Sequence, residues 1–148
     1  MRTTGRRLSC LVVIWGCLEG CGSKTSPTPV TAVVQATNSP SQVPWNGAPI
    51  SAIPECVGVA NTWFFATTLT ETAGASVSIT SSVNTNDGLV RPAFTENIAV
   101  PSKGSVTLNR GFCFNQPTQH TVQSTFTGTD ASGHAITVIS PTVTLLAR

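Results

Sequence analysis

Charged side chains are scarce in this chain, since Lys, Arg, Asp and Glu make up 9% of its 148 residues. The first twenty residues hold three arginines and one glutamate, Arg2, Arg6, Arg7 and Glu19. The rest of the chain keeps five basic and five acidic side chains, so its formal net charge is zero. Without a basic stripe it has no electrostatic surface for nucleic acid or acidic lipid. We therefore exclude nucleic acid as a partner and expect a surface hydrated by Ser, Thr, Asn and Gln.

Helical patterns are also missing, because no apolar period of 3.6 persists for three turns and ten prolines interrupt the long windows. Past residue 29, runs rich in Val, Ile, Thr and Phe are separated by Gly, Pro, Asn and Asp, which is typical of strands and turns. We expect strands at 30–36, 48–53, 61–71, 75–83, 90–94, 104–114, 121–129 and 135–146. The pattern predicts one all-β domain over residues 30–148.

Motifs that carry catalysis are absent from the sequence. No nucleophile elbow such as GxSxG accompanies His120 or His134, and the carboxylates are scattered singly, unlike a glycosidase pair. Asn84-Thr85-Asn86-Asp87-Gly88 has the composition of a calcium loop but lacks its later glutamate, so a hairpin turn is favoured. No Gly-rich phosphate loop follows a strand. We expect no enzymatic activity, no metal and no cofactor.

The N-terminal segment has the features of an export signal. Met1–Arg7 is basic, and the apolar run Leu8–Leu18 is, at roughly ten residues, too short to span a bilayer permanently. Leu18-Glu19-Gly20-Cys21 resembles the lipobox of bacterial lipoproteins, with an aliphatic residue three positions before the cysteine and a small one just before it. Glu19 departs from the family pattern, which has a small or uncharged residue there.

This resemblance implies that residues 1–20 are a lipoprotein signal peptide. Cys21 would become the lipidated first residue, held in the membrane by two or three acyl chains such as palmitate. Gly22 implies the outer membrane by the family's sorting pattern, in a cell with two membranes. Residues 21–29 are polar, as in a flexible tether. Two alternatives stay open, namely a second lipobox ending at Cys17 and an ordinary cleaved secretory signal.

The five cysteines sort by position. Cys10 and Cys17 lie in the signal and Cys21 takes the lipid, which leaves Cys56 and Cys113. In an oxidising compartment these two form one disulfide. It would close a loop of about 57 residues and contribute roughly 4 kcal/mol by chain-entropy arithmetic. A metal site is the alternative, but without a nearby CxxC or clustered His the ligands are too few.

Two turns predict β-hairpins between the strands that flank them, Thr72-Ala73-Gly74 and Asp130–Gly133, because each carries Gly where a tight turn needs positive φ. Phe126–Asp130 with Gly133 and the alternating Ile136–Leu145 resembles the closing hairpin of bacterial immunoglobulin-like domains. The resemblance covers residues 50–147 and implies an antiparallel β-sandwich of seven or eight strands. Unlike antibody domains, the chain has no Tyr for a tyrosine corner.

The run Trp63-Phe64-Phe65 places large rings on both faces of a strand. We predict Trp45 and Phe64 as candidate binding aromatics, because an exposed ring favours a sugar-binding or protein-binding surface. In the alternative, the segment from Val43 to Ala48 folds back so that Trp45 covers Phe64.

Alternation along extended strands predicts where the disulfide lies. Phe112 and Phe114 lie on the face opposite Cys113. An unbroken strand from Cys56 would place five large residues opposite Cys56, namely Val57, Val59, Trp63, Phe65 and Leu69. Each contributes roughly 1.5 to 3 kcal/mol when buried, so these residues should define the core. We expect the disulfide outside the main core, joining Pro54–Gly58 to the strand of Cys113, unless a bulge at Gly58 reverses the parity.

These observations predict a lipid-anchored cell-envelope protein with a non-catalytic domain. Its expected partners are the membrane, through Cys21, and an envelope protein or glycan. Two other roles stay open, an accessory lipoprotein that presents substrate to a separate envelope enzyme and a secreted β-sandwich enzyme.

Overall fold

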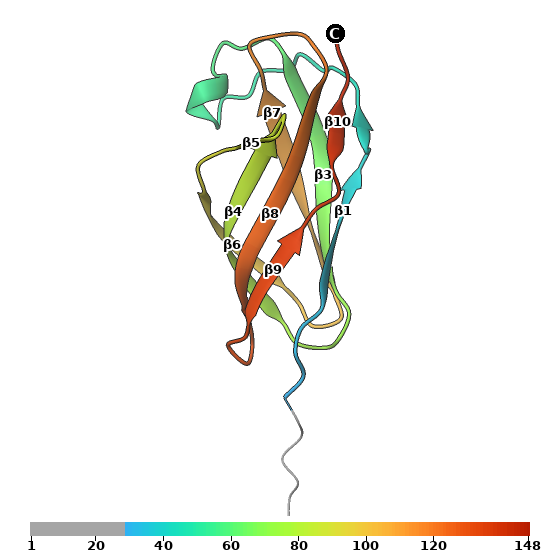
Figure 1. Ribbon diagram of the computed structural model, residues 1–148, viewed down its shortest axis with the longest axis vertical. Coiled ribbons are helices and arrows are strands. Elements are labelled where there is room, and N and C mark those ends of the chain that lie inside the picture. The colour runs from blue at the N-terminus through green and yellow to red at the C-terminus, as the bar shows by residue number, and fades with distance from the viewer. Residues whose placement is uncertain (1–28) are drawn as a thin grey trace, which may run out of the picture.

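The computed structural model describes residues 29–148 and arranges them mainly as β-strands (Figure 1). The strands are β1 (Val34–Ser39), β2 (Gln42–Val43), β3 (Thr62–Glu71), β4 (Val77–Asn86), β5 (Leu89–Val90), β6 (Phe94–Val100), β7 (Ser105–Cys113), β8 (His120–Asp130), β9 (Ala135–Ile139) and β10 (Val143–Leu145). A short 3-10 helix, η1 (Pro54–Cys56), precedes β3. No helix in this part of the chain is long and apolar enough to cross a membrane. The predicted signal, Cys21 and most of the predicted tether lie outside the described residues.

The strands form two sheets that pack face to face. The small sheet has the order β1-β3-β7, with antiparallel pairing throughout. In the large sheet β8 and β4 are central, β9 and β10 pair with β8, and β5 and β6 pair with the other side of β4. The two-residue strand β2 joins β10 in parallel. This arrangement confirms the predicted immunoglobulin-like β-sandwich.

The side chains between the sheets form two apolar clusters in the described residues. The lower cluster contains Ala32, Leu69, Ala75, Val77, Ile79, Ile98, Val100, Phe126, Ile136 and Val138. The upper cluster contains Val43, Trp63, Phe65, Phe112, Val122, Val143 and Leu145. In Figure 1 the chain enters the sandwich beside the lower cluster, at the entry end, and the opposite end is called the far end.

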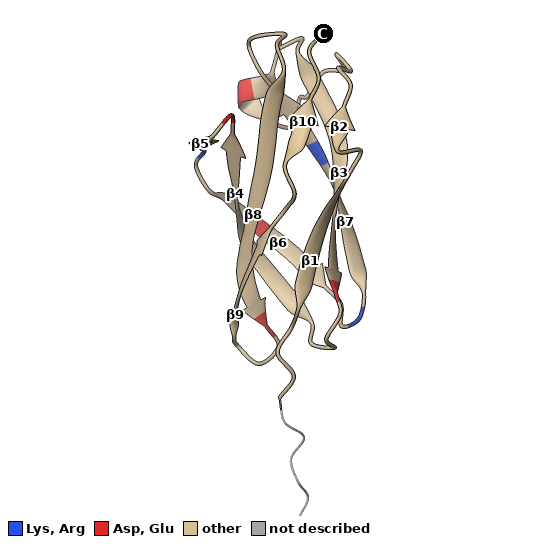
Figure 2. Cartoon of the chain, turned by 45° about the vertical axis from the view of Figure 1, so that its right-hand side comes forward, with Lys and Arg blue, Asp and Glu red and all other residues tan. Residues whose placement is uncertain are grey.

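The outer faces of the sheets carry hydroxyl groups in place of charges. The side-chain oxygens of Thr68 and Thr107 are 2.9 Å apart, and those of Thr70 and Ser105 are 2.8 Å apart. Figure 2 shows the charged residues gathered at the two ends of the sandwich and along the edge formed by β6 and β7. Threonine suits such a face because its branched side chain packs on a pleated surface while its hydroxyl stays hydrated.

The expected strand boundaries hold within a few residues for β3, β4, β7 and β8, whereas β1 begins four residues later than predicted. The strand predicted at 48–53 does not form. The one predicted at 90–94 is divided into β5 and β6, because Pro92 has no N–H for a ladder, and the one at 135–146 is divided at Pro141. The sequence pattern did not predict β2.

One of the two predicted hairpins is confirmed. The turn at Asp130–Gly133 joins β8 to β9, which pair along the length of β9. The hairpin at Thr72-Ala73-Gly74 is wrong, because β3 and β4 belong to different sheets. Gly74 does adopt a positive φ of 113°. However, Leu69 and Ile79 both enter the lower cluster, so the chain crosses from one sheet to the other instead of pairing back on β3.

Candidate functional site

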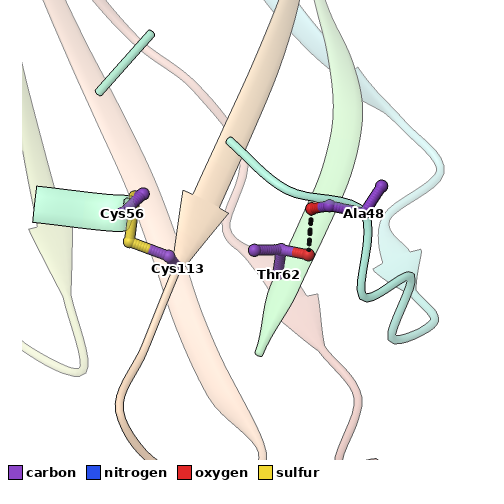
Figure 3. The surroundings of a disulfide bond; sticks show 4 residues. All are labelled: Ala48, Cys56, Thr62 and Cys113. Atoms are coloured by element: carbon purple, nitrogen blue, oxygen red, sulfur yellow. Dashed lines mark hydrogen bonds between the residues drawn. A yellow bond between two sulfur atoms is a disulfide. The ribbon is translucent and has the colours of Figure 1, made fainter. Parts of the chain in front are cut away.

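The segment between β2 and β3, Pro44–Asn61, covers the outer face of the small sheet near the far end (Figure 3), and we call it the cap segment. The hydroxyl of Thr62 donates to the carbonyl oxygen of Ala48 at 2.7 Å. The backbone amide of Asn46 donates to the carbonyl oxygen of Thr62 at 3.0 Å. Thr62 is fully buried by this cover. These bonds hold the backbone against β3 at the place where a separate strand was predicted at 48–53.

Cys56 and Cys113 form the predicted disulfide, with their Cα atoms 5.5 Å apart. Neither cysteine belongs to an apolar cluster. Cys113 pairs in register with Thr62, so both side chains lie on the outer face beneath the cap segment (Figure 3). As predicted, the bond lies outside the inter-sheet core and joins the segment around η1 to β7.

The prediction that strand alternation from Cys56 would place the residues next to it in the core is wrong. Val57 is 65% exposed. The reason is that the chain leaves η1 through Gly58, which has a φ of 79°, and β3 begins only at Thr62. The predicted core residues within β3 and β7, namely Trp63, Phe65, Leu69 and Phe112, are buried.

Phe64 points away from the core and is 39% exposed, consistent with a run that has rings on both faces. It lies over Gly111 together with Ile50 of the cap segment. A Cβ added at Gly111 would meet Ile50 Cδ1 at 3.0 Å and Phe64 Cε1 at 3.2 Å. Ile50 is buried, whereas Trp45, which the alternative expected to cover Phe64, packs against the upper cluster.

Trp45 is half-buried and packs against the upper cluster. The guanidinium carbon of Arg148 lies 4.5 Å from its ring centroid, within the range of a cation–π contact. The indole N–H donates to the carbonyl oxygen of Ala60 at 3.3 Å. The ring and the indole nitrogen of Trp45 are therefore both held by contacts within the far end. Its ring is not a free surface on which a ligand could stack.

His120 lies at the far end within a group of aromatic rings. It stacks on Phe114 with ring centroids 3.8 Å apart, and Trp63 meets both rings edge-on. Its Nδ1 lies 2.7 Å from Oδ2 of Asp87. Its Nε2 faces the carbonyl oxygen of Gln116 at 3.2 Å, and the hydroxyl of Thr118 is 3.4 Å away. These contacts hold the imidazole ring in place between the Asp87 carboxylate and the Thr118 hydroxyl.

Asp87 forms the turn between β4 and β5 with Gly88, at φ values of 50° and 79°. This confirms the predicted hairpin turn. Its Oδ1 accepts the backbone amide of Thr121 at 2.7 Å. Burial raises the pKa of Asp87, but the hydrogen bonds from His120 and Thr121 outweigh it and lower the pKa below its usual value. Within residues 29–148 no three His, Cys, Asp or Glu side chains are grouped to hold a metal.

The entry end is organised by the carboxylate of Glu71, which is 1% exposed. One oxygen accepts the amides of Val33 at 3.2 Å and Ala73 at 2.8 Å. The other accepts those of Gly74 at 2.9 Å and Lys103 at 2.8 Å. The bond from Lys103 is the largest influence on the pKa of Glu71; burial opposes it, but the other three amides add to it, and the pKa falls from 4.5 to about 2.

Asp130 has the same role on the large sheet. Its carboxylate accepts the amides of Ala32 at 3.3 Å, Ser132 at 2.8 Å and His134 at 2.9 Å, and lies 3.0 Å from the ring Nδ1 of His134. Burial raises the pKa of Asp130, but these donors, with His134 first, outweigh it and lower the pKa to about 2.

Sequence reasoning missed the structural role of both carboxylates. A signal was present, because Glu71-Thr72-Ala73-Gly74 and Asp130-Ala131-Ser132-Gly133 share an acid three positions before a glycine. In each turn the carboxylate reaches forward to amides two to four residues later. What the pattern could not show is that the same carboxylates also bind Val33 and Ala32.

A third feature is an ion pair between the edges of the two sheets. Arg110 on β7 lies 3.2 Å from Glu96 on β6, which also accepts the hydroxyl of Ser82 at 2.6 Å. The guanidinium carbon lies 5.2 Å from the Phe126 ring centroid. The Nε and Nη2 atoms of Arg110 are buried without a hydrogen-bond partner in the described part of the chain. Inward charges on edge strands discourage pairing with other chains, which is a structural role.

No protein-family model and no curated protein matches the chain. Several solved structures resemble it at low identity. The putative ApaA protein from Bordetella pertussis is 14% identical with a TM-score of 0.51, covering 80% of this chain and 95% of that one. A CARDB domain from Pyrococcus furiosus is 12% identical with a TM-score of 0.47, covering 78% and 90%. BcpA, the major pilin subunit of Bacillus cereus, is 8% identical with a TM-score of 0.40, covering 78% and 40%. The likeness to the ApaA protein shows a shared fold.

Proposed function

We propose that this protein is a lipid-anchored, non-catalytic module of the cell envelope that binds a protein partner at its far end. A lipid on Cys21 would hold the chain to the membrane, and the segment after it would lead to the entry end of the sandwich. The proposal joins the lipobox resemblance of residues 18–21 to the arrangement of the domain.

The observation that carries this proposal is the separation of the two ends. The chain enters at one end, where Ala32 and Val33 are bound by Asp130 and Glu71. The cap segment, the disulfide and the β4–β5 turn are gathered at the opposite end (Figure 1). A module held to the membrane at its entry end would expose its far end to other molecules of the envelope. The candidate aromatics Trp45 and Phe64 belong to that presented end.

Two measurements test the anchor. Mass spectrometry of the protein extracted from membranes with detergent should find an N-terminal peptide that begins at acylated Cys21. Cys21→Ala should remove the acyl mass and the membrane association, while the matched variant Cys17→Ala should leave both unchanged. A mature chain that begins elsewhere and carries Cys21 as a free thiol contradicts the anchor.

A further inference from the structure

The chain from β5 to the start of β6 exposes apolar side chains on a surface that is otherwise polar. Leu89, Val90 and Phe94 are 63%, 74% and 49% exposed, and every residue between them is exposed as well. We call Leu89–Phe94 the wing segment. Figures 1 and 2 show it standing out beside the upper half of β4. A contiguous exposed apolar segment on a soluble surface marks an interaction site more often than isolated apolar residues do.

The backbone of the wing segment is held before it, within it and at its end. The Asp87–Gly88 turn before it is held to β8 by the carboxylate of Asp87. Within it the amide of Arg91 donates to the carbonyl oxygen of Asn84 at 2.8 Å, and at its end Phe94 pairs with β4. The apolar side chains are thus presented on a preorganised backbone, which lowers the entropy that a partner's binding must overcome.

The geometry of β5 indicates what shape of partner fits. Successive residues of a strand point to opposite faces, so Leu89 and Val90 project from the two sides of the wing segment. A flat protein surface would cover only one of them. Burial of both requires a cleft with apolar walls on either side.

The charge next to these residues indicates the polar component of the partner. Arg91 is exposed and takes part in none of the ion pairs formed among residues 29–148. A carboxylate at the edge of the cleft would pair with its guanidinium in a bidentate manner.

The edge itself does not favour a second copy of this chain. Arg91 and Asn84 are a hydrogen-bonded pair, so by alternation the backbone groups of Val90 point away from β4, while Pro92 has no N–H. Val90 is therefore the only residue of β5 that offers both backbone groups outward, which is too few for a ladder with a second copy, and a charge and a proline beside β5 discourage edge-to-edge pairing. Lipid is also disfavoured, because hydrocarbon has no hydrogen-bond donor or acceptor for the backbone groups of Val90, whereas a protein can supply both at the base of a cleft.

We propose that the wing segment is the binding surface of this module and that its occupant is a folded protein. That protein has an apolar cleft that encloses Leu89 and Val90 and a carboxylate that pairs with Arg91. This proposal rests on the proposed binding role and does not depend on the lipid anchor.

Site-specific photocrosslinking of the full-length chain in its native cells tests the proposal. p-Benzoylphenylalanine at Val90 should yield one adduct with a different protein, and the same probe at the exposed Thr107 of β7 should not. Arg91→Glu in the Val90 probe chain should reduce the adduct about tenfold, because it places like charges together. Ile139→Ser removes another exposed apolar side chain and should leave the yield unchanged.

Three results would overturn the proposal: no adduct at Val90, an adduct with lipid or a second copy, or a yield that Arg91→Glu does not change. All substituted residues are exposed, so thermal melts of the variants should match the wild type and rule out misfolding. The acylation of Cys21 is measured in the same cells. Loss of the adduct from an acylated protein then counts against the wing segment alone, whereas an unacylated protein that still crosslinks counts against the anchor alone.

Discussion

Glu71 binds the backbone amide of Val33 at 3.2 Å, and the preceding amide, that of Ala32, is bound by Asp130 at 3.3 Å. The two carboxylates belong to different sheets, Glu71 to β3 and Asp130 to β8. Two consecutive residues before β1 are therefore fixed to both layers of the sandwich at once. This arrangement determines where the N-terminal segment leaves the domain.

Replacement of either carboxylate by its amide should destabilise the domain. In Glu71→Gln the side-chain amide presents N–H groups toward four backbone donors, so at least part of the cluster loses its acceptor. The urea midpoint should fall, and amide hydrogen exchange at Val33, Ala73 and Gly74 should accelerate. Glu55→Gln, on an exposed residue of η1, is the matched control and should leave the midpoint unchanged.

Acid should weaken the fold in a defined pH range. The pKa values of Glu71 and Asp130 are lowered from 4.5 and 3.8 to about 2. Since their folded pKa values lie below the unfolded ones, they contribute stability above about pH 4.5 that is lost as the pH falls toward 2. Urea unfolding measured from pH 7 to pH 2 should show this loss, and Glu71→Gln should reduce it. An unfolding free energy that stays constant between pH 4.5 and 2 contradicts the two carboxylate sites.

The disulfide should contribute measurably to stability. It closes a loop of 57 residues, so the double variant Cys56→Ser/Cys113→Ser should lose about 4 kcal/mol of unfolding free energy by loop-closure entropy. Reduction of the wild type with a thiol should have the same effect, and the double variant should be insensitive to it. Hydrogen exchange should rise in the cap segment first, because the bond joins that segment to β7.

The Arg110–Glu96 pair predicts a non-additive mutant cycle. Glu96→Leu leaves a guanidinium between the sheets and should cost roughly 2 kcal/mol, less than the 3 to 5 kcal/mol of a fully buried pair because both side chains keep some exposure. Arg110→Met/Glu96→Leu removes both charges and should recover most of this loss. The single variant Arg110→Met completes the cycle. If the loss in the double variant equals the sum of the losses in Glu96→Leu and Arg110→Met, the two residues do not act as a pair.

Gly128 should tolerate no side chain. It lies opposite the register shift between Ile79 and Ser81, and an added Cβ would overlap the backbone of Ser78 and Ile79. Gly128→Ala should cost about 3 kcal/mol, at the upper end of typical overpacking losses. Thr127→Ala, at the exposed neighbouring position of β8, should change the unfolding free energy by less than about 0.5 kcal/mol. Equal effects of the two substitutions would contradict the bulge.

The fold class could be predicted from the sequence because its signals are local. Alternating Val, Ile, Thr and Phe in β3, β7 and β8 encode strands, and the glycines at 74, 88 and 133 encode turns. The disulfide followed from counting cysteines. Pro92 and Pro141 are also visible in the sequence as strand breakers. Whether a proline ends a strand or only interrupts it depends on which strands are its neighbours.

Sheet membership could not be predicted because it is decided by burial between layers. The sequence around Thr72–Gly74 fits a hairpin, yet Leu69 and Ile79 are both buried only when the chain crosses to the other sheet. The strand expected at 48–53 was likewise lost to contacts with Thr62 and with Gly111, of which Gly111 lies far along the chain.

The sequence by itself determined an all-β domain, a paired Cys56 and Cys113, and which residues of β3 face the core, because these depend on local alternation and on residue counts. Only the tertiary structure decided the rest. It placed Glu71 and Asp130 beside the amides of Val33 and Ala32, Arg110 beside Glu96, and Leu89 and Val90 on an exposed wing. The two carboxylate contacts join segments distant in the sequence, and such pairings are fixed only when the two sheets bury their apolar faces against each other.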